Sequence, residues 1–334
     1  MLHIRSLRDV VSDEKSKLAG LRYQAPLPLL FAKKPFSSPI SLQWCDSWQR
    51  VTASKPPLSA LYLPSSFWLS SNGETVNPLH VKRFQELLSQ SSIKLWPPLA
   101  WDQLVERKDI VYSRLHEFML PAQWILFSAV GGDVSKMKNC LIRWCQQRGN
   151  GRYFLKGCET SCGSCAEQIT FSNGRFEEDV EKILREFQSD NQIGVGIQPF
   201  IPGFDSFEIR TFMVWDPFSK KWRSALTLKT ALLLSKEFSV EQFAPLHGHG
   251  LLIAGMIDEM MEKRADFFKQ IHDLGVPMLR IDCGFDGGNQ RPFLSEFALA
   301  GDAQLWCSIH NQDLAYVIGR AMGDQLWNQM TQSI

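Results

Sequence analysis

The chain has 334 residues, with 36 Lys and Arg against 35 Asp and Glu, which gives a formal net charge of +1. With 44% hydrophobic and 21% charged residues, it has enough apolar material for packed cores, so wholesale disorder is excluded. The near-neutral balance argues against a protein that coats nucleic acid or a membrane by charge. No apolar run reaches the roughly 18–20 residues of a membrane span, and the first residues lack a secretory signal, so we expect a cytoplasmic protein.

The first third of the chain is rich in proline, which breaks regular structure into short pieces. The remaining pattern predicts a strand near 58–63, a helix over 80–88, a strand at 93–95 and a helix over 104–118. Pro121 ends that last helix because proline cannot continue it.

Helices and strands alternate more regularly after residue 122. Apolar runs predict strands at 124–130, 153–155, 194–201, 208–215, 222–230, 278–283 and 291–298. Helical periodicity with caps predicts helices at 133–149, 177–187, 253–274 and 312–328. This order indicates an α+β fold with mostly antiparallel strands between the helices.

The segment RYFLKGCETSCGSCAEQ has three interpretations that the sequence leaves open. A strand ending in Lys156 and a loop of small residues would direct backbone N–H groups and an ammonium at a phosphate. The spacing Cys158-x3-Cys162-x2-Cys165 is also one by which proteins hold an iron–sulfur cluster. The third interpretation is a surface turn that carries reduced cysteines.

The segment IDCGFDGGNQRPFLSEF predicts a hairpin with one carboxylate on each strand. If the phenylalanines on either side of the turn pair, Asp282 lies directly opposite Glu296, with Cβ atoms about 5 Å apart. Two carboxylates flanked by apolar residues repel each other, and a bound Mg²⁺ would relieve that repulsion. The alternative is a structural hairpin whose acids face water or pair with Arg280 or Arg291.

Two cations lie inside apolar strands, Arg210 in EIRTFMV and Lys229 in SALTLKTALL. A buried arginine needs a fixed anionic partner, which for Arg210 is either a ligand phosphate or Glu208 two residues away. We expect Lys229 to point toward the same site as Arg210.

The order of these segments resembles the ATP-grasp superfamily over roughly residues 100–300. The segments are ERKDIVYSRLHEFMLP, YFLKGCETSCGS, IQPFIPG, EIRTFMV and LRIDCGF…PFLSEF. The resemblance implies two α+β subdomains that clamp ATP, preceded by a pre-grasp domain. We therefore expect a pre-grasp substrate domain at 1–121, a small subdomain at 122–201, and a large subdomain with the metal site at 202–334.

The resemblance also implies roles for individual residues. Two lysines would reach the phosphates and adenine, a small-residue loop would cover the β- and γ-phosphates, and a hinge would bind adenine through backbone groups. These residues are Lys108 and Lys156; Thr160, Ser161, Cys162, Gly163 and Ser164; and Gln198, Phe200 and Ile201, with Asp205 near the ribose. Arg210, with Lys229, would stabilise the transferred phosphoryl group, and Asp282 and Glu296 would bind Mg²⁺.

One position departs from the family pattern. The last motif usually ends Glu-x-Asn, but residue 298 is alanine, so a metal ligand is missing or is supplied elsewhere, for example by Asp302. The implied reaction is Mg²⁺-dependent activation of a carboxylate as an acyl phosphate, which an amine then attacks. Its partners would be ATP and an unidentified small-molecule or peptide acceptor. The alternatives are an ATP-grasp phosphotransferase, a nucleotide-binding assembly or regulatory protein with little turnover, and, outside this fold, an iron–sulfur protein at the three cysteines.

Overall fold

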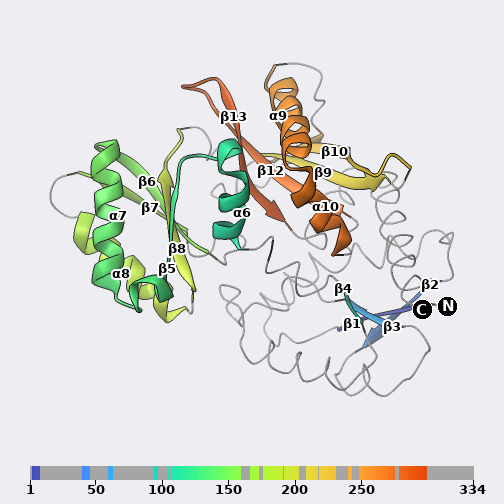
Figure 1. Cartoon of the computed structure of the whole chain (residues 1–334), viewed down its shortest axis with the longest axis horizontal. Helices are drawn as coiled ribbons and strands as arrows, with labels where there is room; N and C mark the ends of the chain where they lie inside the picture. The colour runs from blue at the N-terminus through green and yellow to red at the C-terminus, as the bar shows by residue number, and fades with distance from the viewer. Residues whose placement is uncertain are drawn as a thin grey trace.

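The computed structural model shows three β-sheets with helices packed beside and between them (Figure 1). The residues that the structure describes are 2–7, 40–45, 59–62, 94–96, 104, 107–158, 166–172, 176–190, 192–202, 208–216, 218–230, 240–242, 248–274 and 278–298. None of the helices in these ranges is long and apolar enough to cross a membrane.

The N-terminal sheet is parallel, with strand order β2-β1-β3-β4. Its strands are β1 (Leu2–Leu7), β2 (Ile40–Cys45), β3 (Ser59–Tyr62) and β4 (Lys94–Trp96). The strands predicted near 58–63 and 93–95 are thus confirmed, whereas β1 and β2 were not predicted. The helices predicted at 80–88 and 312–328 lie outside the described residues.

The second sheet and two helices form what we call the small lobe. The sheet is antiparallel in the order β5-β8-β6-β7, and α7 and α8 cover one of its faces. The elements are β5 (Gln123–Leu126), the 3-10 turn η3 (Phe127–Val130), α7 (Val134–Arg148), β6 (Gly151–Gly157), β7 (Ala166–Phe171), α8 (Phe176–Ser189) and β8 (Gly194–Pro199). β7 is an element that the apolar pattern did not predict.

Side chains alternate across the small-lobe sheet. Tyr153 and Leu155 on β6 pack into the core against α7 and α8, so Phe154 and Lys156 lie on the face that these helices leave open. Asp133 caps α7 by accepting hydrogen bonds from two backbone N–H groups of its first turn, as its position predicted.

The strand predicted at 124–130 is wrong in its second half. From Phe127 the chain turns into η3, and the N–H of Gly132 donates to the Phe127 carbonyl over 2.8 Å. Gly131 ends the turn at φ 66°, a conformation that glycine adopts without strain. The apolar residues after Leu126 are therefore buried by a turn and not by a strand.

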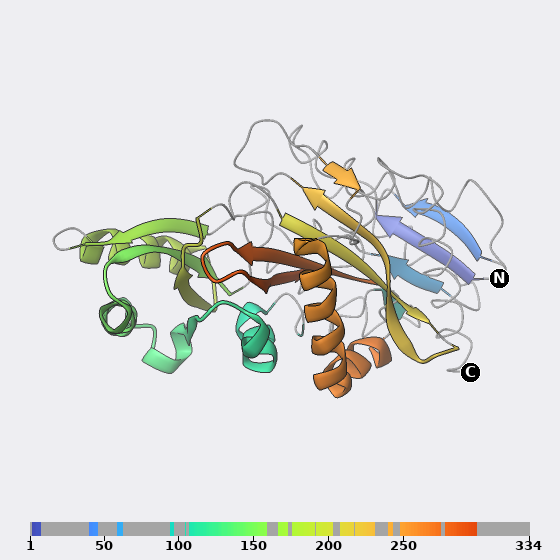
Figure 2. The same ribbon diagram turned by 90° about the horizontal axis from the view of Figure 1, so that it is seen from above.

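The third sheet and its helices form the large lobe. The sheet is antiparallel in the order β11-β10-β9-β12-β13, and α9 lies across one of its faces, as Figure 2 shows. The elements are β9 (Glu208–Asp216), β10 (Lys221–Thr230), β11 (Val240–Gln242), α9 (His249–Lys263), α10 (Ala265–Asp273), β12 (Met278–Asp286) and β13 (Arg291–Ala298).

The single helix predicted at 253–274 is two helices. The chain breaks at Arg264, whose backbone angles of φ −119° and ψ 34° are not helical. The Arg264 guanidinium is held there by Glu117, with nitrogen–oxygen distances of 2.7 and 2.9 Å. This tertiary contact is not visible in the local apolar periodicity.

A short helix lies between the two lobes (Figure 1). It is α6 (Lys108–Leu115), followed by the 3-10 turn η2 (His116–Phe118). Its apolar residues Val111, Leu115 and Phe118 belong to the core of the large lobe. The helix predicted at 104–118 is confirmed in its main part, and the domain limits given above stay a prediction.

Candidate functional site

The open faces of the two sheets carry polar side chains that meet near α6. On β6, Phe154 and Lys156 lie opposite Gln198 and Gly196 of β8, all on the face away from α7 and α8. The Lys108 ammonium, from the first residue of α6, lies 3.7 Å from a carboxylate oxygen of Glu296 on β13. Lys156 also interacts electrostatically with Glu296 and Lys108, so the small lobe, α6 and the large lobe all contribute charged groups to one place.

The large-lobe part of this site is a buried ion-pair network. Asp282 lies opposite Arg210 on β9 and opposite Glu296 on β13. Both oxygens of Asp282 accept hydrogen bonds from Arg280, from Nε at 2.7 Å and from a terminal nitrogen at 2.6 Å. Arg210 lies 3.8 Å from the same carboxylate and donates to Glu208 over 3.0 and 3.1 Å.

The acids of this network differ in how strongly they hold a proton. Burial raises the pKa of Glu208 to about 7, and repulsion from Asp282 adds to this effect, while Arg210 opposes it. Burial alone would raise the pKa of Glu296 as well. Attraction from the surrounding cations, with Lys108 the strongest, outweighs burial and holds the pKa of Glu296 below its ordinary value. Glu296 is thus the more readily ionised of the two.

The two lysines come from different elements, α6 and β6, but face the same acids. Burial lowers the pKa of Lys156, with Lys108 adding repulsion and with Glu296 and Glu208 acting in the opposite direction. The backbone N–H of Lys108 also donates to the carbonyl of Cys158, at the end of β6, over 3.1 Å. This bond joins the start of α6 to the strand that carries Lys156.

The residues predicted to bind adenine lie at the end of β8. Gln198 is half-buried on the same face as Lys156, and Ile201 is also half-buried. The buried ring of Phe200 lies 5.4 Å from the Phe154 ring, measured between centroids, and its N–H donates to the Arg152 carbonyl over 2.9 Å. That N–H is therefore already engaged and is not an open donor for a nucleobase.

The predicted register of the β12–β13 hairpin is confirmed at the acids and corrected near the turn. Asp282 does lie opposite Glu296, but Phe293 pairs with Gly284 and not with Phe285. A register shift after Asp282 leaves Ser295 as an extra residue on β13, a β-bulge. Between the turn and the bulge, the pairing is one residue away from the predicted register. Beyond the bulge it agrees with the prediction, so the two acids lie opposite each other on one face.

Lys229 does not lie on the face of the sheet that carries this site. In the pairing of β9 with β10, Lys229 is opposite Ile209, a core residue, whereas Arg210 is opposite Leu228. Because opposite residues share a face and neighbours alternate, Lys229 and Arg210 lie on different faces of the sheet. The register therefore does not support a shared site for the two cations, and the role of Lys229 stays a prediction.

Two residues of the network were considered from the sequence only as counter-ions. Arg280 and Glu208 each lie two residues from a predicted site residue, and this spacing places them on the same face of the strand. The structure therefore contains both ion pairs that the sequence offered as alternatives, Arg210 with Glu208 and Arg280 with Asp282. Both pairs are part of the candidate site. The remaining predicted residues lie outside the described residues; they are Thr160, Ser161, Cys162, Gly163, Ser164 and Asp205.

The carboxylates of this site suit a Mg²⁺ ion that takes only one or two of its ligands from the protein. Within the described residues, no group of three or more His, Cys, Asp or Glu side chains is placed to hold a metal ion. Mg²⁺ commonly uses only one or two carboxylates and completes its shell with phosphate oxygens and water. Glu296, whose side chain is 34% exposed, offers such a carboxylate, while Asp282 is 0% exposed and bonded to Arg280.

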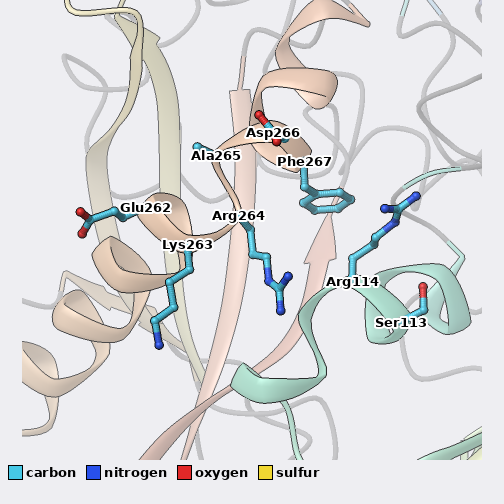
Figure 3. Close-up of a pocket in the computed structure, with 8 residues that line it drawn as sticks. All are labelled: Ser113, Arg114, Glu262, Lys263, Arg264, Ala265, Asp266 and Phe267. Atoms are coloured by element: carbon cyan, nitrogen blue, oxygen red, sulfur yellow. The ribbon is translucent and has the colours of Figure 1, made fainter.

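A separate hollow of about 440 Å³ lies between the end of α6 and the corner of α9 and α10 (Figure 3). Arg114, Lys263 and Arg264 contribute to its lining. Arg264 is paired with Glu117, and Lys263 with Glu259 at 2.6 Å. This hollow contains none of the predicted site residues.

The whole chain shares its fold with solved structures of ATP-grasp ligases, so the resemblance seen in the sequence is confirmed at the level of fold. D-Cycloserine synthetase DcsG matches with a TM-score of 0.61 and 11% identity, over 98% of this chain and 100% of that chain. D-Alanyl-alanine synthetase A from Vibrio cholerae matches with a TM-score of 0.59 and 10% identity, over 98% of both chains. The ATP-grasp ligase PsnB, complexed with its minimal precursor, matches with a TM-score of 0.53 and 12% identity, over 97% of this chain and 98% of that chain. No protein-family model and no curated protein matches the sequence.

Proposed function

We propose that this protein is an ATP-dependent, Mg²⁺-requiring ligase that activates a carboxylate as an acyl phosphate for attack by an amine. The observation that carries the proposal is the convergence of Lys156, Lys108 and Arg210 on the carboxylates of the large lobe. One solved structure with this fold, of PsnB, is a complex with a precursor variant, Mg and ADP.

The chain's own residues would act by charge neutralisation and positioning. Lys108 and Lys156 would bind the nucleotide phosphates, and Gln198 and Ile201 would border the adenine. Arg210 and Arg280 would meet the negative charge that develops as the γ-phosphoryl group passes to the carboxylate. A Mg²⁺ held by Glu296, with Asp282 beside it, would supply further neutralisation of the phosphates.

A second candidate function is nucleotide binding with little turnover, or transfer of phosphate to an acceptor other than a carboxylate. The observation that favours it is residue 298, where alanine replaces the asparagine that the family pattern expects. Product analysis separates the candidates, because a ligase converts ATP to ADP continuously only when both an acid and an amine are present. A phosphotransferase needs the acceptor alone, and a binding module releases none.

The first test is a thermal-shift titration of the wild type and Glu296→Gln with ATP, Mg²⁺ and both together. A ligand at 100 times its Kd adds about 2.7 kcal/mol of stability, so we expect a rise of several degrees in wild-type Tm. The rise should need both ligands and be lost in Glu296→Gln. Lys182→Gln, an exposed substitution on α8, is the matched control and should keep the full shift. An unshifted wild type would contradict nucleotide binding at this site.

A further inference from the structure

We propose that a second, narrower hollow between the two lobes binds one ordered water molecule, and that this water, held by the indole N–H of Trp124, fixes the orientation of the Gln198 side-chain amide toward the nucleotide base. The inference rests on the proposed ATP-dependent function. It adds to that function a water site and a positioning residue, Trp124, which acts through Gln198.

The strand register places Trp124 beside the residues that carry the candidate site. Trp124 on β5 is directly opposite Gly196 on β8, which in turn is opposite Lys156 on β6, so all three share the open face of the small-lobe sheet. A Cβ at Gly196 would meet carbon atoms of the Trp124 ring at 2.4, 2.5 and 2.6 Å, so the indole lies over the glycine. Gln198 is the next residue of β8 on this face and lies diagonal to Trp124, within reach of long side chains.

The indole N–H of Trp124 is a buried donor that has no direct acceptor from the protein. Its Nε1 atom is withdrawn from solvent, and it has no hydrogen-bond partner among the residues that the structure describes. Buried indole N–H groups usually find a partner, and an unpaired one costs free energy. This donor therefore indicates a small polar ligand beside the ring.

The hollow beside Trp124 has the size and the lining for one water molecule. Its volume is about 10 Å³. A cavity of about 10–15 Å³ is the smallest that holds a single water, so an organic ligand does not fit. A cation is disfavoured as well, because an N–H group presents positive charge to it. The polar residues of the lining come from four elements; they are Tyr112 on α6, Trp124 on β5, Gln198 on β8 and Ser295 on β13.

Two of these polar residues are held in place by the backbone around them. The Tyr112 oxygen accepts a hydrogen bond from the N–H of Ala122 over 2.9 Å, which fixes the side chain at the start of the small lobe. Ser295 is the extra residue of the bulge on β13, and bulges commonly redirect a side chain next to a functional site. The large lobe thus contributes a hydroxyl to a hollow whose other polar groups come from α6 and the small lobe.

The donors and acceptors of the lining determine how the water binds. Since Trp124 can only donate, the water accepts from it and directs its own hydrogens at the oxygens of Ser295 and Tyr112. The second lone pair of the water accepts from the NH₂ group of Gln198. The Oε1 atom of Gln198 then faces away from the hollow, toward the open face that carries Lys156, where it accepts from the 6-amino group of adenine.

The base preference of the protein tests this orientation. Inosine triphosphate carries an oxo group where ATP carries its 6-amino group, so the wild type should bind ATP more tightly, measured by calorimetry with Mg²⁺. Trp124→Phe keeps an aromatic ring but removes the N–H, and the preference should fall by about threefold to tenfold, the contribution of one hydrogen bond. Trp144→Phe, in the helix-covered core of the small lobe, is the matched control and should keep the wild-type preference. A wild type that prefers inosine triphosphate, or an unchanged preference in Trp124→Phe, would overturn the inference.

Ser295→Ala removes a partner of the same water from the other lobe. The preference for ATP should fall by a similar factor. The double variant with Trp124→Phe should lose no more than either single variant, because both changes release one water. Ser189→Ala, an exposed serine at the end of α8, is the matched control and should behave as the wild type does. Losses that multiply in the double variant would show that the two residues do not share a ligand.

A high-resolution crystal structure of the nucleotide-free protein tests the water itself. We expect one ordered water within hydrogen-bond distance of Trp124 Nε1 and of the Gln198 amide, and a dry hollow would overturn the inference. This measurement needs no nucleotide, so it separates the inference from the proposed function. Failure of both ATP and inosine triphosphate to bind would refute the proposed function and, with it, the role of this water in base selection. A dry hollow in a protein that binds ATP would refute the inference alone.

Discussion

Asp282→Asn is the substitution for which the structure changes the expectation most. If Asp282 binds Mg²⁺, as the family resemblance implies, this variant should lose Mg·ATP turnover while the chain stays folded. In the structure, Asp282 is 0% exposed and is the shared partner of Arg280, which is 7% exposed, and of Arg210, which is 8% exposed. Removing one partner of a buried ion pair costs about 3–5 kcal/mol, because the remaining charge stays in a poorly hydrated site without compensation. We therefore expect Asp282→Asn to be strongly destabilising as well as inactive.

The magnitude can be measured as a shift in Tm and in the urea midpoint. At about 2 °C per kcal/mol for a chain of this size, Tm should fall by roughly 6–10 °C. Glu296→Gln is the matched control, since its carboxylate is partly exposed and its ion pair with Lys108 spans 3.7 Å. Partly exposed pairs contribute about 1 kcal/mol or less, so this variant should melt within a few degrees of the wild type. Equal Tm values for Asp282→Asn and wild type would refute the reasoning, because the ion pairs of Asp282 with Arg280 and Arg210 would then be absent in solution.

Three further predictions concern other parts of the fold. A Cβ at Gly196 would meet the Trp124 ring at 2.4 Å, so Gly196→Ala should cost about 1–3 kcal/mol of stability in urea unfolding, while Gly151→Ala, whose nearest neighbour lies at 3.9 Å, should not. Asp133→Ala removes the cap of α7 and should cost about 1 kcal/mol, measured by thermal unfolding; an unchanged Tm would mean that the cap is not formed. Because the pKa of Glu208 is raised from 4.5 to about 7, the folded chain binds its proton more tightly than the unfolded chain, and stability should fall as pH rises from about 4.5 to 7. That part of the decline should disappear in Glu208→Gln, and identical pH profiles of Tm for the two proteins would contradict the shift.

The sequence was sufficient for features set by local pattern and insufficient for those set by tertiary contacts. The caps of α7 and the turn of the β12–β13 hairpin follow from residue types at fixed positions, and both are confirmed. The break at Arg264 depends on Glu117, a residue far away in the chain, so helical periodicity alone could not show it.

Strand faces explain the remaining successes and errors at the site. Asp282 and Glu296 were paired correctly from the sequence, although the assumed pairing near the turn was off by one residue. The Ser295 bulge shifts the register by one residue and so compensates for that error. The sequence could not show which face of the sheet carries Lys229, because the face depends on the residue paired with it across the sheet, which is Ile209.

The buried charges of the large lobe are difficult to explain by stability alone. Replacing a buried ion pair with apolar residues of similar volume is often neutral or stabilising, so pairs such as Arg210–Glu208 and Arg280–Asp282 add little net stability. Burial also disfavours the charged forms of Lys156 and Glu208, as their shifted pKa values show. A fold that keeps these groups together at such a cost holds them in fixed positions before any ligand arrives. Fixed dipoles and charges that need no reorganisation are what stabilise a developing phosphoryl charge most effectively, and this is the physical argument for a phosphate-handling site between the two lobes.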